Sequence, residues 1–138
     1  MPVESDDQIR DLLLDVHRIA VLGIKAQPHE DAYRVPAYLQ ARGYRILPVN
    51  PKLEWVLGEP AVSELAQLRE TPDLVNVFRR AESLPGHVDE ILTLPRRPRA
   101  VWLQLGIRHD AAAQRLEAEG IAVIQDRCLM VEHARLLP

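Results

Sequence analysis

Cysteine is nearly absent from this chain of 138 residues: Cys128 stands alone, which excludes an intramolecular disulfide and a cysteine-based zinc cluster. Long apolar runs are missing as well. One of the longest, at 19–23, is far shorter than the roughly 20 residues that cross a bilayer. The acidic first residues, MPVESDDQIRD, lack the basic-then-apolar pattern of a secretory signal peptide. We therefore expect a cytoplasmic protein without membrane contact.

An excess of positive charge is also missing. The net charge is −3 and the isoelectric point about 5.9, which argues against an extended nucleic-acid surface. Lysine is scarce, whereas arginine is abundant and eleven prolines are present, a profile typical of a GC-rich or thermophilic source. The 47% of hydrophobic and 27% of charged residues predict one soluble globular domain over 1–138.

The motifs of several enzyme classes are absent. The sequence contains no G-x-x-x-x-G-K-[ST] phosphate loop and no G-x-S-x-G nucleophile elbow. Its five histidines show no metal-ligand spacing. Gly23 stands alone where the dinucleotide fingerprint would place three glycines. We therefore expect neither a catalytic residue nor a metal site.

What the sequence does contain is a regular alternation of apolar strands and helices. Five strands are predicted in RIAVLGI, YRILPVN, DLVNVF, AVWLQLG and IAVIQD. Helices are predicted at 6–15, 31–42, 87–94 and 109–119, with a short one from Ser63 and a last one from Leu129. Ser5 and Gln8 form a capping-box pattern at the first helix, and Gly43 follows the second.

This alternation predicts βαβ units with right-handed crossovers. The expected fold is α/β, a Rossmann-like, doubly wound three-layer α/β/α sandwich with a five-stranded, mainly parallel sheet. The most economical strand order is 3-2-1-4-5. Trp102, inside the fourth strand, is expected in the core, and Asp126 is expected to cap the last helix.

Ligands of such sheets bind beyond the carboxyl ends of the strands, at the switch point beside the first strand. Four cations follow strands in an otherwise acidic chain: Lys25, Lys52, Arg79 and Arg80. Arg34 lies near the start of the second predicted helix, where an anion is favoured. The guanidinium fork suits phosphate because it donates two aligned hydrogen bonds. The pattern predicts a pocket for a phosphorylated ligand.

The residues after the second strand bear on which ligand this is. NAD-binding domains place an acid there to hold the ribose hydroxyls, whereas this chain has Asn50, Pro51 and Lys52. A ligand with a diphosphate and a phosphorylated ribose fits better, and both CoA and NADP have these groups. From the residues alone, both remain open, and an NAD(P)-binding regulatory or redox domain is the alternative to CoA binding.

Five stretches together resemble a known family: RIAVLGI, AYRVPAYLQARGYRILPVNP, LVNVFRR, VWLQLGI and DRCLMVEH. They resemble the small stand-alone CoA-binding proteins of bacteria and archaea, which are similar to the N-terminal CoA-binding domain of the succinyl-CoA synthetase α subunit. The resemblance covers the chain from about Ile9 to Glu132. It implies CoA as ligand, bound at the switch point without catalysis.

The resemblance also implies roles for residues at matching positions. Gly23, Ile24, Lys25 and Ala26 would meet the diphosphate, and Arg34 would help to hold phosphate. Asn50, Pro51 and Lys52 would lie near the ribose phosphate. Phe78, Arg79 and Arg80 would pack on the adenine and neutralise charge, although Phe78 fits a core position equally well. Gln104, Leu105 and Gly106 would border the pantetheine arm.

The chain departs from the family in its first loop. Relatives carry hydroxyl side chains there, whereas this sequence has Lys25, Ala26 and Ala32, so each lost contact would cost about 1 kcal/mol of CoA binding. The phosphate-carrying domain of the synthetases has no counterpart in the sequence. An acyl-CoA enzyme is a possible partner, and a CoA-binding subunit completed by a separate chain is a second alternative. Cys128 is expected to pack as a small apolar residue.

Overall fold

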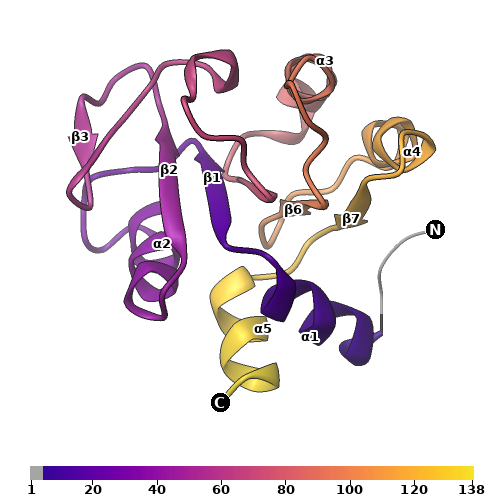
Figure 1. Cartoon of the computed structure of the whole chain (residues 1–138), viewed down its shortest axis with the longest axis horizontal. Helices are drawn as coiled ribbons and strands as arrows, with labels where there is room; N and C mark the ends of the chain where they lie inside the picture. Colours follow the sequence, from indigo (N-terminus) through magenta and orange to yellow (C-terminus); the bar gives the residue numbers. More distant parts are fainter. Residues whose placement is uncertain (1–4) are drawn as a thin grey trace.

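The computed structural model describes residues 5–138, and Figure 1 shows a sheet with helices on both faces. Residues 1–4 lie outside this range; they begin the N-terminal segment whose sequence lacks the signal-peptide pattern. Five parallel strands form the main sheet: β1 (Arg18–Leu22), β2 (Arg45–Val49), β5 (Leu74–Val77), β6 (Ala100–Leu103) and β7 (Ala122–Ile124). The expected α/β class is confirmed.

The strand order differs from the expected 3-2-1-4-5 in one respect. The observed order is β2-β1-β5-β6-β7, so the third long strand lies between the first and the fourth. Ile19 of β1 is opposite Leu74 of β5. The outer edge of β2 is occupied instead by the crossover chain, where Val62 forms a parallel bridge with Val49. The switch point of this order lies between β1 and β5.

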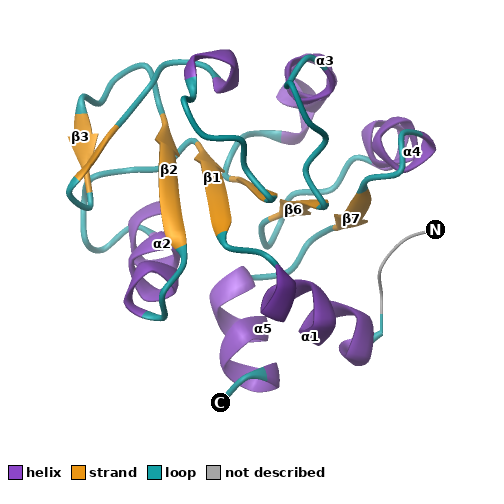
Figure 2. Cartoon of the chain, in the orientation of Figure 1, coloured by secondary structure: helices purple, strands orange, loops and turns teal. Residues whose placement is uncertain are grey.

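Helices α1 (Asp6–Asp15), α2 (Asp31–Ala41) and α5 (Leu129–Leu136) cover one face of the sheet. Helices α3 (Leu84–Leu92) and α4 (Asp110–Ala118), with the 3-10 turn η1 (Leu65–Gln67), cover the other (Figure 2). A second 3-10 turn, η2 (Ala81–Ser83), precedes α3. None of the helices in residues 5–138 has the length and apolarity to cross a membrane.

The predicted local elements are largely found. Helix α1 begins at the predicted capping box, in which the Gln8 amide donates to Ser5 Oγ at 3.2 Å. The short helix expected from Ser63 is the single turn η1, and α3 begins earlier than the expected His87. A small hairpin of β3 (Trp55–Val56) and β4 (Glu59–Pro60) was not predicted, because two-residue strands leave no alternating pattern.

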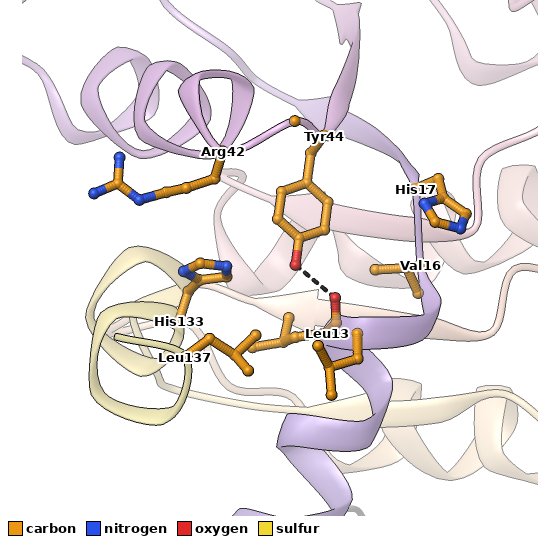
Figure 3. Close-up of a pocket in the computed structure, with 9 residues that line it drawn as sticks. Leu13, Val16, His17, Arg42, Tyr44, His133 and Leu137 are labelled. Atoms are coloured by element: carbon orange, nitrogen blue, oxygen red, sulfur yellow. Dashed lines mark hydrogen bonds between the residues drawn. The ribbon is translucent and has the colours of Figure 1, made fainter.

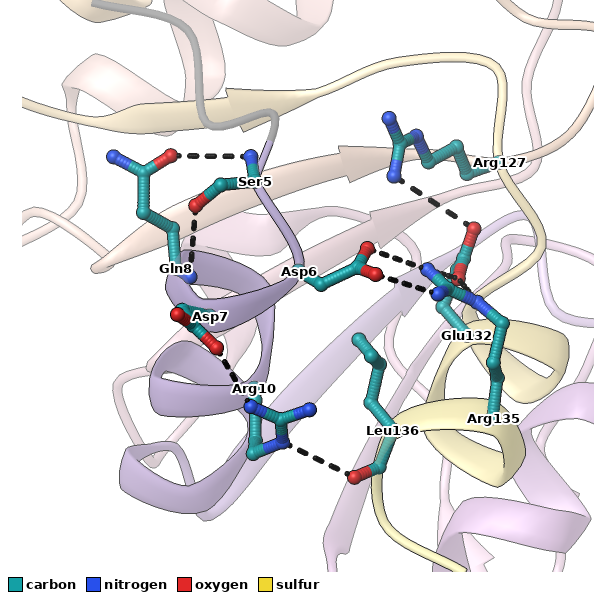
Figure 4. A network of polar contacts seen from close by, with 9 residues as sticks. All are labelled: Ser5, Asp6, Asp7, Gln8, Arg10, Arg127, Glu132, Arg135 and Leu136. Carbon is teal, nitrogen blue, oxygen red and sulfur yellow. Dashed lines mark hydrogen bonds and ion pairs between the residues drawn. The ribbon is translucent and has the colours of Figure 1, made fainter.

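Helices α1 and α5 are joined by a network of charged side chains (Figure 4). Arg135 donates to both carboxylate oxygens of Asp6 at 2.8 Å and to Glu132. Arg10 donates from Nε to the Leu136 carbonyl at 3.3 Å. The hydrogen bond from Arg135 holds the pKa of Asp6 below its ordinary value. These exposed contacts orient the two helices, whereas the buried apolar side chains beneath them supply most of the stability.

Asp73 connects the chain before β1 to the start of β5. Its Oδ2 accepts the amides of His17 and Arg18 at 2.9 and 2.8 Å. Burial alone would raise the pKa of this carboxyl, but the two amide hydrogen bonds and the Arg18 guanidinium hold the pKa below its ordinary value. The charged form is therefore favoured by folding, and its contribution to stability is present above the unfolded-state pKa of 3.8.

We accordingly expect Asp73→Asn to lower the free energy of unfolding at pH 7 and to matter less at acid pH. The pKa of Asp73 is lower in the folded protein than in the unfolded chain. The stabilisation by the Asp73 charge therefore begins to fall when the pH drops below the pKa of the unfolded chain, and it is lost when the pH drops below the pKa of the folded protein. Urea unfolding at pH 7 and pH 3 measures this, with exposed Asp11→Asn as the control. If Asp73→Asn lowered the free energy of unfolding by the same amount at pH 7 and at pH 3, the expectation would be contradicted.

Candidate functional site

An open hollow of about 380 Å³ lies at the carboxyl ends of β1, β5 and β6, beside the start of α2. Residues from four segments line it: Gly23, Lys25, Glu30, Asp31, Ala32, Phe78, Arg79, Arg80, Gln104, Leu105 and Ile107. The hollow therefore lies at the switch point of the sheet, where parallel α/β proteins bind their ligands.

Gly23 allows the turns after β1 and β5 to approach each other. Its φ is +84°, a backbone conformation that residues other than glycine rarely adopt. Its amide donates to the Val49 carbonyl at 3.0 Å. A Cβ at this position would lie 2.6 Å from the Phe78 carbonyl oxygen and 3.2 Å from Arg79 Nε. The position thus combines an unusual backbone conformation with a close backbone contact.

Lys25, Arg79 and Arg80 place positive charge around the hollow. These three and Lys52, which follows β2, have no ion-pair partner among residues 5–138. Arg79 is half-buried, and its Nε is buried without a hydrogen-bond partner among the described residues. Buried donors are seldom left unpaired, so this guanidinium is positioned to take a partner from outside the chain.

Most of the arginines at the opposite end of the sheet are paired. Arg45 reaches Glu70 at 2.6 Å, and Arg97 reaches Glu119 at 2.9 Å. Arg99 contacts Asp15. Arg42 and Arg69 also lack an ion pair among the described residues, but Arg42 follows α2 and Arg69 precedes β5, away from the hollow. Of the six lysines and arginines without an ion pair among residues 5–138, four therefore lie at the carboxyl ends of the strands.

The start of α2 supplies backbone donors to the same hollow. The cap residue Glu30 makes no side-chain capping bond, and the amides of Asp31 and Ala32 have no partner among the described residues. A helix N-terminus with free amides attracts anions. The carboxylates of Glu30 and Asp31 oppose this attraction, although Asp31 is paired with Arg34 at 3.1 Å. The two acids were not among the predicted site residues.

Several predicted residues do not line the hollow. Ile24 is fully buried in the core, and Arg34 is exposed, pairs with Asp31 and does not line the hollow. Asn50 is 5% exposed; its Nδ2 donates to the Ile24 carbonyl at 2.7 Å, and its Oδ1 accepts the Lys52 amide at 2.8 Å. These contacts hold the turns after β1 and β2 together.

Asp126 holds the loop after β6, whereas the sequence pattern predicts that it caps the last helix. Asp126 does not cap α5, whose cap residue is Cys128. Asp126 instead has a φ of +58° and accepts the Gly106 amide at 2.7 Å, which fixes the loop bearing Leu105 and Ile107. The core position of Trp102 is confirmed, since it is 0% exposed. Ala26, Pro51 and Gly106 are exposed at this edge without lining the hollow.

A second hollow, of about 320 Å³, lies among α1, α5 and the end of α2 (Figure 3). Two of its polar groups are engaged, since the Tyr44 hydroxyl donates to the Leu13 carbonyl and His133 Nδ1 lies 3.0 Å from the Tyr38 hydroxyl. The guanidinium of Arg42 points away from it in Figure 3. Burial, with the nearby Arg42, lowers the pKa of His133. This hollow offers a ligand little.

A five-stranded parallel sheet with helices on both faces and a hollow at its switch point defines the class of Rossmann-like α/β domains. The particular family follows from the sequence itself. Residues 17–134 match the family model described as the CoA binding domain, and the chain belongs to this family.

The chain is also similar along nearly its whole length to other proteins. The Bacillus subtilis (strain 168) protein "Uncharacterized protein YneT" is 39% identical over 130 residues, which cover 94% of this chain and 95% of that protein. A solved structure from Thermus thermophilus is 46% identical, with a TM-score of 0.92, and covers 97% of this chain and 100% of its own. A relative from this source fits the thermophile-like composition.

A more distant likeness is to the "dinucleotide forming Acetyl-coenzyme A synthetase 1" of Ca. Korarchaeum cryptofilum, solved with phosphate and ADP. It is 15% identical with a TM-score of 0.69, and the match covers 83% of this chain and 27% of the synthetase. At this identity the likeness concerns the fold alone.

Proposed function

We propose that this protein binds CoA or acyl-CoA at the carboxyl edge of its sheet and catalyses no reaction by itself. The observation that carries the proposal is the set of cations without ion-pair partners at this edge, Lys25, Lys52, Arg79 and Arg80, in a chain of net charge −3. Membership of the CoA binding domain family supports CoA as the ligand.

The distribution of charge suits the three phosphates of CoA. Gly23 and Lys25, with the free amides at the start of α2, would bind the diphosphate, and Lys52 would lie toward the ribose phosphate. Arg79 and Arg80 would neutralise the remaining charge, with Phe78 beside them as an apolar surface for the adenine. Pantetheine would extend over β6 toward Gln104 and Leu105.

A role without catalysis is supported by the lining of the hollow. Among the described residues it is lined by no serine, cysteine, histidine or tyrosine, which leaves Lys25, Glu30 and Asp31 as its groups able to act as a nucleophile or proton carrier. Of its two carboxylates, Asp31 is engaged with Arg34. Cys128 is half-buried and packs against the apolar side chains beneath α1, α2 and α5.

Calorimetric titration with CoA, dephospho-CoA, NADP and NAD tests the proposal. We expect CoA to bind most tightly, and dephospho-CoA to bind about 10- to 100-fold more weakly because it lacks one phosphate and the charged hydrogen bonds to it. Absence of CoA binding below millimolar concentration would refute the proposal. Tighter binding of NADP or NAD would assign the hollow to a nicotinamide nucleotide, and copurification of an acyl-CoA enzyme would indicate a subunit role.

A further inference from the structure

Asn76 is a polar residue in the middle of the most central strand of the sheet. It lies in β5 opposite Trp102, is 0% exposed, and points toward the face covered by α1, α2 and α5. Its Nδ2 donates to the Trp102 carbonyl at 3.4 Å and to Gln104 Oε1 at 3.3 Å. Its Oδ1 is buried without a hydrogen-bond partner among the described residues. A leucine of similar size would avoid the cost of that unpaired oxygen.

Gln104 is the residue that Asn76 contacts at the edge of the hollow. It is 5% exposed and follows β6, and its Oε1 accepts a second hydrogen bond, at 3.3 Å, from the Leu129 amide at the start of α5. The backbone amide can only donate, so the side-chain atom that faces it must be the oxygen. Two donors from two different elements therefore determine the orientation of the Gln104 amide.

In this orientation Gln104 Oε1 is engaged within the protein, and Nε2 is available to donate a hydrogen bond in the hollow. Gln104 lines the hollow, and its Nε2 has no hydrogen-bond partner among the described residues. Phe78, Leu105 and Ile107 line the same hollow with apolar side chains. A neutral N–H donor beside apolar surface suits an uncharged oxygen acceptor, such as an amide carbonyl, better than it suits a phosphate.

We propose that Asn76 is a positioning residue: together with the Leu129 amide it holds Gln104 so that Nε2 donates a hydrogen bond to an uncharged carbonyl oxygen of the ligand, beyond its phosphates. This inference rests on the proposed function, because it assigns the neutral arm of CoA to the β6 side of the hollow. Gln104 contacts the ligand, and Asn76 acts through Gln104.

The test compares two ligands, CoA and adenosine 3′-phosphate 5′-diphosphate, which is the same nucleotide without the neutral arm. Loss of one neutral hydrogen bond predicts about 3- to 10-fold weaker CoA binding by Gln104→Met, and Asn76→Leu should weaken CoA binding by about 2- to 5-fold. Neither change should alter binding of the truncated nucleotide. The double variant should bind CoA no more weakly than Gln104→Met alone, because Asn76 acts through Gln104.

Gln104→Glu serves as a second variant that keeps an oxygen for the Leu129 and Asn76 donors while replacing Nε2 by an acceptor. It should lose more CoA affinity than Gln104→Met, and far-UV circular dichroism of both variants checks that the fold is kept despite the buried carboxylate. Equal weakening of both ligands, or full additivity in the double variant, would show a purely structural role and overturn the inference. If the parent binds no CoA at all, the proposed function fails as well, and the two failures are thereby distinguished.

Discussion

Replacing Arg79 and Arg80 together by alanine will weaken CoA binding by about 2–4 kcal/mol, or roughly 30- to 900-fold. Each guanidinium can give charged hydrogen bonds worth about 1.5–3 kcal/mol, and neighbouring contributions do not add fully. Both side chains line the hollow and have no ion-pair partner among the described residues, so the substitutions break no ion pair there. Calorimetric titration measures the loss.

The matched control is Arg96→Ala with Arg97→Ala, which removes the same charge from the opposite end of the sheet. Arg96 and Arg97 are paired with Asp73 and Glu119. This control should leave CoA affinity nearly unchanged, while the far-UV circular dichroism of the Arg79/Arg80 variant should remain that of the parent. Unchanged affinity in the Arg79/Arg80 variant would mean that the ligand binds elsewhere.

Gly23→Ala should lower the free energy of unfolding by about 2–4 kcal/mol. A left-handed backbone costs a residue with a Cβ roughly 1–2 kcal/mol. The new methyl group would in addition lie 2.6 Å from the Phe78 carbonyl oxygen, so the turns after β1 and β5 must separate. Because Arg79 follows Phe78 directly, CoA binding should fall as well. Urea unfolding gives the stability, and titration gives the affinity.

Gly120→Ala separates the cost of the left-handed backbone from the cost of the contact with the Phe78 carbonyl oxygen. Gly120 has nearly the same φ, +81° against +84°, but an added Cβ there has no neighbour within 4 Å. It should therefore cost only the roughly 1–2 kcal/mol of backbone strain and leave ligand affinity intact. Equal losses of stability in the two variants would show that the contact with Phe78 does not matter.

Local structure could be predicted because its causes are local. The Ser5–Gln8 capping box gave the start of α1, and the glycine at 43 gave the end of α2 to within one residue. The strand order could not be predicted in the same way. All five strands are apolar and alike in sequence, so nothing local distinguishes β1 from β2 as the partner of β5.

A hollow lies at the place that the sequence predicts for the site, but only some of the predicted side chains line it. Topology brings every strand end to one edge, so Gly23, Lys25, Arg79 and Gln104 were found together. Asn50 and Arg34 stand at the same edge, but their side chains are engaged by the Ile24 carbonyl and by Asp31. Such partners are chosen by side-chain orientation in three dimensions, which spacing along the chain does not encode.

The separation of paired and unpaired cations also makes the molecule electrically polar. At the amino ends of the strands Arg45, Arg97 and Arg99 are paired with acids, whereas Lys25, Lys52, Arg79 and Arg80 at the carboxyl ends have no ion-pair partner among residues 5–138. We expect a polyphosphate that comes within a screening length of about 8–10 Å to be attracted most strongly at that end. Such attraction would orient the ligand before contact. The association rate constant should therefore rise as the ionic strength is lowered.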